Sequence, residues 1–142
     1  MLITGLGGLK GVSLPDSIHP VEWVPYTWLL PRLSAMVHHG GAGSTAAGLR
    51  AGLPQLVLPF GYDQMLWARQ IHALGIGPRP IPAEAVTVEN LTPAFRELLS
   101  NPGFRDRATA MKEQIAGEDG IGAAVKIVIE AMDRHAAQVV VP

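Results

Sequence analysis

The sequence predicts an α/β fold in which helices flank a parallel sheet. Through the first half of the chain, short apolar runs that end at Gly or Pro alternate with stretches of helical spacing. Hydrophobic residues make up 48% of the 142 residues, and 16 Gly and 12 Pro supply the tight turns that short buried strands require. Because strands alternate with helices, right-handed crossovers are expected to bring consecutive strands into one parallel sheet.

Four apolar segments are predicted as strands because each is too short to form a helix. They are MLIT (1–4), VEWV (21–24), SAMVHH (34–39) and QLVLPF (55–60). A weaker fifth strand is predicted over residues 79–81, where flanking prolines favour an edge position because Pro cannot donate to a ladder.

Helices are predicted where apolar residues recur with helical spacing. These segments are 26–33, 44–51 and 63–74, followed in the C-terminal third by 88–99, 104–115 and 121–132. Thr87 is the expected N-cap of the first C-terminal helix, and Asn101, Pro102 and Gly103 separate it from the next. We expect the C-terminal helices to pack on the sheet.

Length and composition predict one domain over residues 1–135 and a short tail over residues 136–142. The formal net charge of −1 and the 16% of charged residues leave no basic stripe for nucleic acid. The chain has no Cys, and no apolar run reaches the roughly 18 to 20 residues that span a bilayer. We therefore expect a cytoplasmic protein with neither a transmembrane segment nor a nucleic-acid partner.

The first predicted strand begins at Met1, so we expect that edge of the sheet to be uncovered in this chain. Uncovered strand edges pair readily with other chains. We expect the chain to be part of something larger and to form a homo-oligomer through its exposed strand edge and apolar surface.

The stretch AMVHHGGAGSTAAGLRAGLPQLVLP (35–59) places a Gly-rich turn between a strand that ends at His39 and a helix that opens at Ser44. Glycines let backbone N–H groups approach an anion, and the helix N-terminus adds unsatisfied donors and a positive dipole end. A phosphate or diphosphate fits there, with His39 donating to a phosphate oxygen. The alternative is a turn that only permits tight packing. His38 points to the opposite face of the strand, and we expect it to pack.

Two further groups of residues follow predicted strands at the same carboxyl edge. Asp63 and Gln64 place an acid beside an amide, which suits vicinal sugar hydroxyls, although Asp63 could instead cap a helix. Trp23 places a flat ring where it could stack on a planar base, although a core position is the alternative.

Together these segments resemble the nucleotide-sugar-dependent glycosyltransferases with two Rossmann-like domains, the GT-B fold, and in particular their C-terminal, donor-binding domain. HHGGAGSTAAGLRAGLP is similar to the HHGGAGT signature of bacterial macrolide and glycopeptide glycosyltransferases and of sterol glucosyltransferases, within the UDP-glycosyltransferase superfamily. PFGYDQMLWARQIHALGIGP is similar to the usual continuation. Trp23, Val24 and Pro25 match the opening of the longer plant signature, and the spacing from His39 to Asp63 agrees with it.

The resemblance implies a Rossmann-like donor domain, truncated at its N-terminus, that binds a UDP- or dTDP-sugar. Trp23 would stack on the uracil or thymine base, and the backbone of Val24 would read the base edge. The implied diphosphate contacts are His39, the backbone amides of Gly41, Ala42, Gly43, Ser44 and Thr45, and the hydroxyl of Ser44 or Thr45. Asp63 and Gln64 would hold the hexose hydroxyls. Such enzymes transfer the sugar to an acceptor hydroxyl with inversion, and the resemblance implies neither a cofactor nor a required metal.

Two positions depart from the plant signature, because Tyr26 stands where plant relatives have Gln and Ala47 stands where they have a ribose-binding Glu. The sequence also lacks the N-terminal acceptor domain that supplies the catalytic base in this family, so no catalytic residue is assigned. We expect that the chain does not glycosylate an acceptor unaided and that it works with an acceptor-domain partner.

Two other functions remain open from the sequence. The first is a non-catalytic binding module that retains the fold. The second is a dinucleotide-dependent oxidoreductase, which Gly5, Leu6, Gly7 and Gly8 fit poorly because no acidic residue follows at the expected distance.

Overall fold

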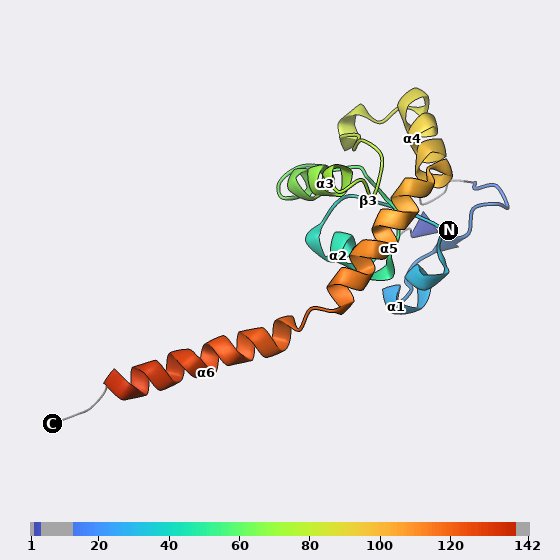
Figure 1. Ribbon diagram of the computed structural model, residues 1–142. Helices are drawn as coiled ribbons and strands as arrows, with labels where there is room; N and C mark the ends of the chain where they lie inside the picture. The colour runs from blue at the N-terminus through green and yellow to red at the C-terminus, as the bar shows by residue number, and fades with distance from the viewer. Residues whose placement is uncertain (1, 4–12, 139–142) are drawn as a thin grey trace.

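The computed structural model describes residues 2–3 and 13–138, and within them it confirms the α/β class with parallel strands flanked by helices. Figure 1 shows helices around a small central sheet and one long helix that leads away from it. The two ends of the first predicted strand, the Gly5 to Gly8 segment and residues 139–142 lie outside the described residues.

The described strands form two separate two-stranded parallel sheets. In the first, β1 (Leu2–Ile3) pairs with β2 (Pro20–Val21). In the second, β3 (Met36–His38) pairs with β4 (Gln55–Val57). The strand predicted over 21–24 is therefore shorter and ends before Trp23. We expected one continuous sheet, and the described strands do not form one.

No strand forms over residues 79–81, although this segment runs beside β4. The Ile81 N–H donates to the Val57 carbonyl at 3.2 Å, and the Gln55 N–H donates to the Ile76 carbonyl at 3.1 Å. Every second residue from Pro78 to Pro82 is a proline without an N–H, so the hydrogen bonds stay isolated and no regular ladder develops.

The predicted helices are found, with ends that differ by a few residues. The first half of the chain holds α1 (Tyr26–Leu29) with the 3₁₀ turn η1 (Leu30–Arg32), α2 (Ala42–Ala51) and α3 (Gln64–Ala73). After the 3₁₀ turn η2 (Ala83–Ala85) follow α4 (Val88–Ser100), α5 (Pro102–Ala116) and α6 (Gly120–Gln138). Thr87 caps α4 as predicted, because its hydroxyl accepts from the Asn90 N–H.

The core lies on both sides of β4, a strand that is buried along its whole length. One cluster joins β4 to α3 and α5 through Val57, Ile71 and Ala108, and a second joins β3 to η1 through Met36 and Leu30. Because both clusters anchor α2 and its neighbours, the carboxyl ends of β3 and β4 are held at one edge of the domain.

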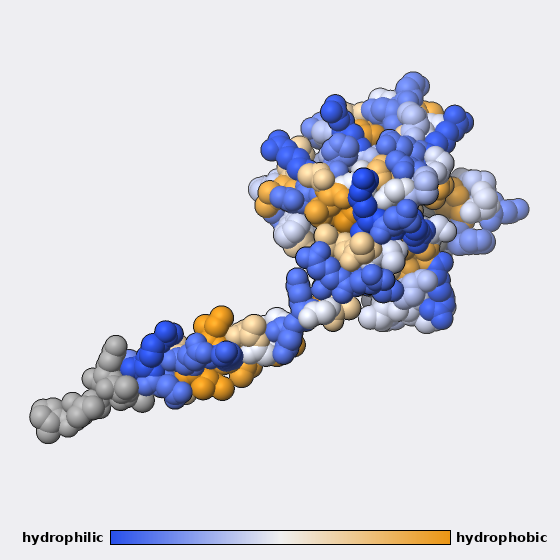
Figure 2. Space-filling model, in the orientation of Figure 1, coloured by the Kyte–Doolittle hydropathy of each residue, from blue (hydrophilic) through white to orange (hydrophobic). Residues whose placement is uncertain are grey.

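The prediction that all C-terminal helices pack on the sheet is wrong for α6. This helix leads away from the rest of the domain (Figure 1), and its apolar side chains are exposed (Figure 2). The exposed residues include Ile121, Val125, Val128 and Met132. A helical spacing of apolar residues predicts that a helix has an apolar face, but it does not predict which segment covers that face. Self-association of the chain stays a prediction.

No helix among the described residues is both long enough and apolar enough to span a bilayer.

Candidate functional site

The turn between β3 and α2 forms an open helix N-terminus. Gly40 has a φ of +89°, a conformation that favours glycine, and Gly41 is the N-cap of α2. The first helical hydrogen bond runs from the Thr45 N–H to the Gly41 carbonyl at 3.0 Å, so the N–H groups of residues 42–44 precede it. A Cβ atom added at Gly43 would meet no atom within 4 Å, so the space beside this residue is open. The arrangement favours an anion.

The imidazole of His39 lies over this helix end. Its Nε2 atom is 2.5 Å from the place where a Cβ on Gly41 would stand, and the side chain is exposed to solvent. The ring is therefore directed at the N-cap of α2, where an imidazole N–H can donate to the same anion as the backbone amides.

Thr45 does not offer the donors that the sequence predicted for it. Its side chain is buried, and both its backbone N–H and its hydroxyl donate to the Gly41 carbonyl at 3.0 Å. Both donors are used in forming the first turn of α2, which leaves Ser44 as the hydroxyl of this turn that can reach a ligand.

The turn between β4 and α3 lies against the first turn. A Cβ added at Gly40 would be only 3.1 Å from the carbonyl oxygen of Gln64, so the two backbones touch. Asp63 is the N-cap residue of α3, and it is exposed with no side-chain capping hydrogen bond. The side-chain capping role considered for Asp63 is thus absent, and its carboxylate faces solvent beside the β3–α2 turn.

Gln64 is partly engaged within its own turn. Its Oε1 atom accepts from the Phe60 N–H at 2.7 Å, so the side-chain amide nitrogen is the group left for a ligand. Tyr62, which precedes Asp63, has a φ of 54° in the left-handed region, and its ring is exposed.

Trp23 follows β2 and is 80% exposed, while Val24 is half-buried. The core position considered for Trp23 is therefore wrong. An exposed indole on a short loop is available as a stacking surface. None of the described contacts joins Trp23 to the β3–α2 turn.

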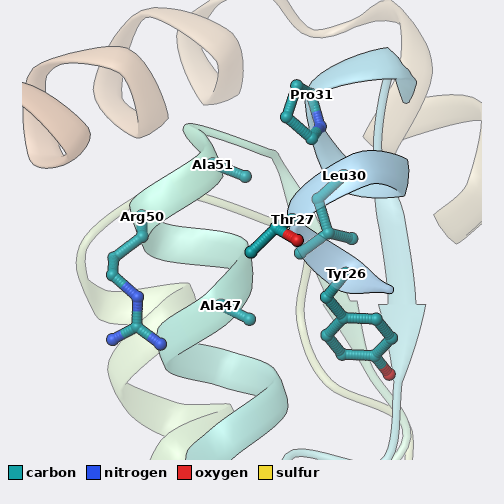
Figure 3. A pocket seen from close by; sticks show the side chains of 7 residues that line it. All are labelled: Tyr26, Thr27, Leu30, Pro31, Ala47, Arg50 and Ala51. Carbon is teal, nitrogen blue, oxygen red and sulfur yellow. The ribbon is translucent and has the colours of Figure 1, made fainter. Parts of the chain in front are cut away.

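A pocket of about 500 Å³ lies between α1 and α2, which the sequence analysis did not predict. Figure 3 shows its lining, with Tyr26 and Thr27 from α1 on one side and Ala47 and Arg50 from α2 on the other. Tyr26 and Ala47 are the two positions that depart from the plant signature. None of the residues predicted to contact the donor lines this pocket. The only feature of the sequence that pointed to it is that Tyr26 and Ala47 differ from the plant signature.

His38 is more than a packing residue. Its Nε2 atom lies 2.8 Å from Oε1 of Gln55, and its Nδ1 atom accepts from the Gly40 N–H at 3.0 Å. Burial lowers the pKa of His38, the hydrogen bond to Gln55 raises it and the neighbouring His39 lowers it, and the net shift is downward from the ordinary value of 6.5. The sequence did not indicate the contact with Gln55, because Gln55 lies on the next strand.

Comparisons with known proteins cover most of the chain. Residues 8–131 match the family model described as "Erythromycin biosynthesis protein CIII-like, C-terminal domain". The chain is 42% identical over 133 residues to a sterol 3-beta-glucosyltransferase of Arabidopsis thaliana, covering 92% of this chain and 21% of that protein. It is 36% identical to the O-mycaminosyltylonolide 6-deoxyallosyltransferase of Streptomyces fradiae, covering 88% of this chain and 29% of that protein.

A solved structure extends the likeness to the fold. The glycosyltransferase VinC, crystallised in complex with DTDP, is 27% identical with a TM-score of 0.75, and the match covers 86% of this chain and 31% of that one. The chain thus spans less than a third of the length of these relatives. The motifs, the fold and the family match agree, and the chain belongs to the erythromycin biosynthesis protein CIII-like C-terminal domain family of GT-B glycosyltransferases.

Proposed function

We propose that this chain binds a UDP- or dTDP-hexose and presents it for inverting transfer of the sugar to an acceptor hydroxyl. The observation that carries the proposal is the open N-terminus of α2 with the His39 ring over its N-cap and the Asp63 turn against it. The DTDP complex of VinC supports a nucleoside diphosphate as ligand.

Each part of the site has a role in this proposal. The amides of residues 42–44, the Ser44 hydroxyl and His39 hold the diphosphate, while Asp63 and the amide nitrogen of Gln64 hold hexose hydroxyls. Trp23 stacks on the base, and the backbone of Val24 reads its edge. No metal or cofactor is required in this scheme.

The transfer breaks the bond between the anomeric carbon and the diphosphate oxygen and forms a bond from that carbon to the acceptor oxygen. The electron pair of the broken bond goes to the diphosphate, and the acceptor proton goes to a base outside this site. Amides and an imidazole already aimed at the diphosphate stabilise the charge that develops on it.

Replacing His39 with alanine is expected to weaken nucleotide binding about tenfold, since a charge-assisted hydrogen bond to phosphate is lost. Isothermal titration calorimetry of the chain with UDP and dTDP measures this change. His135→Ala, an exposed histidine on α6, is the matched control and leaves binding unchanged. Equal binding by the His39→Ala variant and the unchanged chain contradicts the assignment.

We also propose that transfer requires acceptor-binding residues and a base from outside this chain, whether from the rest of a longer protein or from a partner chain. The chain matches less than a third of its relatives' lengths, which supports this division. The purified chain is expected to give no glycoside when incubated with UDP- or dTDP-glucose and a sterol or macrolide acceptor, followed by mass spectrometry. Detection of a glycoside above the no-protein control contradicts it.

A non-catalytic interaction module is the second candidate, favoured by the exposed apolar residues of α6. The calorimetry separates the two functions, because a module without a donor site binds neither UDP nor dTDP.

A further inference from the structure

A chain of hydrogen bonds, here called the His38 network, links β3, β4 and α2 directly beneath the anion-binding turn. Nδ1 of His38 accepts from the Gly40 N–H at 3.0 Å, and Nε2 of His38 lies 2.8 Å from Oε1 of Gln55. The Gln55 amide nitrogen then donates to the Thr45 carbonyl at 3.5 Å. The network therefore joins both ends of the turn, since Gly40 precedes α2 and Thr45 lies in its first turn.

The partners determine where the protons lie. A backbone N–H is only a donor, so Nδ1 of His38 must carry a lone pair toward Gly40. Nε2 then carries the proton and donates to Oε1 of Gln55, which orients the Gln55 amide nitrogen toward Thr45. Only a neutral His38 with its proton on Nε2 satisfies all of these contacts, because a protonated ring would direct an N–H at the Gly40 N–H.

The network is closely packed. Gln55 is fully buried, and a Cβ added at Gly48 would lie 2.7 Å from the Gln55 side-chain carbon Cδ. Gly48 thus leaves room in α2 for the Gln55 side chain. A buried amide held by specific partners on both sides keeps one orientation, because losing a partner leaves an unsatisfied polar group.

We propose that His38 is the positioning residue of the donor site: its neutral ring holds the Gly40 amide, and with it the β3–α2 turn, in the geometry that receives the diphosphate. Protonation of His38 breaks this contact and releases the turn, so donor affinity falls at acidic pH. This inference rests on the proposed function and deepens it, because His39 contacts the ligand whereas His38 acts through Gly40.

The surroundings of His38 agree with a neutral ring. His39, on the same strand, is the titratable group that acts on it, with the two ring centroids 6.5 Å apart. From β4 it meets the uncharged Gln55, and from the β3–α2 turn it meets the Gly40 backbone. The one charged residue of α2, Arg50, lines the pocket toward α1. From α3, the Asp63, Arg69 and His72 side chains are exposed to solvent.

The shift also has a consequence for stability. Folding lowers the pKa of His38 below its ordinary value of 6.5, mainly because burial disfavours the charged ring. This difference in the pKa of His38 contributes to the free energy of unfolding. The contribution is fully present at pH values above the pKa of the unfolded chain and is lost as the pH falls through the lower pKa of the folded chain. Acid therefore weakens the fold and the donor site in the same direction.

Two isosteric variants separate the contacts of His38. His38→Asn places an amide oxygen where Nδ1 stands and keeps an acceptor for Gly40 at every pH, whereas His38→Gln keeps the donor to Gln55 and loses that acceptor. Affinity for UDP-glucose and dTDP-glucose is measured by calorimetry from about pH 8 to about pH 5.5. These sugar diphosphates keep their charge over this range, so changes in affinity come from the protein.

At about pH 8, His38→Gln is expected to bind about tenfold more weakly than the unchanged chain, and His38→Asn within about threefold of it. On acidification the unchanged chain loses affinity and His38→Asn does not. Equal binding by His38→Gln and the unchanged chain at about pH 8, or an acid loss that persists in His38→Asn, overturns the proposal.

A nucleotide-free measurement tests the network even if no nucleotide binds. Nitrogen NMR of the unchanged chain is expected to show His38 with its proton on Nε2, and Gly40 amide exchange, corrected for its intrinsic rate, is expected to accelerate as His38 is protonated. The positioning role is overturned if the proton lies on Nδ1, or if the exchange rate of the Gly40 amide does not change as His38 is protonated. Absence of binding at every pH, with these NMR signs present, refutes the donor site and with it the proposed consequence for affinity.

Discussion

Replacing Gly77 with alanine is expected to lower the free energy of unfolding by about 2 to 4 kcal/mol. An added Cβ would lie only 1.8 Å from the carbonyl oxygen of Gln55, which is backbone in the buried strand β4. The backbone cannot yield locally, because the Gln55 N–H is bonded to the Ile76 carbonyl at 3.1 Å and both residues are fully buried. Urea denaturation followed by circular dichroism measures the loss.

The control for Gly77 is a glycine in open space. A Cβ added at Gly120, at the start of α6, would meet no atom within 4 Å, so Gly120→Ala is expected to leave the unfolding free energy within about 0.5 kcal/mol. If Gly77→Ala is as stable as Gly120→Ala, the close packing of residues 76–78 on β4 is wrong.

Replacing Gly40 with alanine is expected to lower the free energy of unfolding by about 2 to 3 kcal/mol and to weaken nucleotide binding as well. Its φ of +89° is strained for any side chain, and the new Cβ would lie 2.6 Å from Cγ1 of Val57 and 3.1 Å from the Gln64 carbonyl oxygen. Relieving the overlap separates the two turns that form the site. Urea denaturation and calorimetry with dTDP measure the two effects.

The neighbouring glycine provides a matched comparison. Gly41→Ala meets only the exposed ring of His39, with 2.5 Å to Nε2, and its own φ of −61° suits alanine. The ring can move, and what remains is the poorer capping by alanine at the N-cap. We therefore expect Gly41→Ala to reduce dTDP affinity and to lower the unfolding free energy by no more than about 1 kcal/mol. Equal stability of the Gly40→Ala and Gly41→Ala variants contradicts the strain assigned to Gly40.

Local signals in the sequence predicted the helix ends and the glycine turn correctly. The cap at Thr87, the helix boundary at Asn101 and the Gly-rich turn before α2 each depend on residues within a few positions of one another. Capping and positive-φ glycines act over one turn of backbone, so they are visible without tertiary structure. The helix predictions therefore agree closely with the structure. The strand predicted over 79–81 does not form, because the alternate prolines lack the N–H groups that a regular ladder with β4 requires.

The candidate site likewise has features that the sequence predicted and features that only the structure shows. The His39 ring lies over the N-cap of α2, and the Asp63 side chain makes no capping hydrogen bond. Both positions agree with the geometry that the motif implied. That Thr45 and Gln64 already have partners could be seen only in the folded chain. The ligand contacts themselves stay predictions, to be tested by the binding measurements above.

By itself, the sequence determined that the chain alternates strands and helices, that a glycine turn opens onto a helix N-terminus, and that a histidine and an acid follow neighbouring strands. Only the tertiary structure decided that Gln55 and His38, 17 positions apart, meet beneath that turn, and that α6 leaves its apolar side exposed. The physical reason is the separation along the chain over which each kind of interaction acts. Backbone conformation and capping are set by adjacent residues, whereas the partner of a buried polar group and the cover of an apolar face depend on which distant segments fold against them.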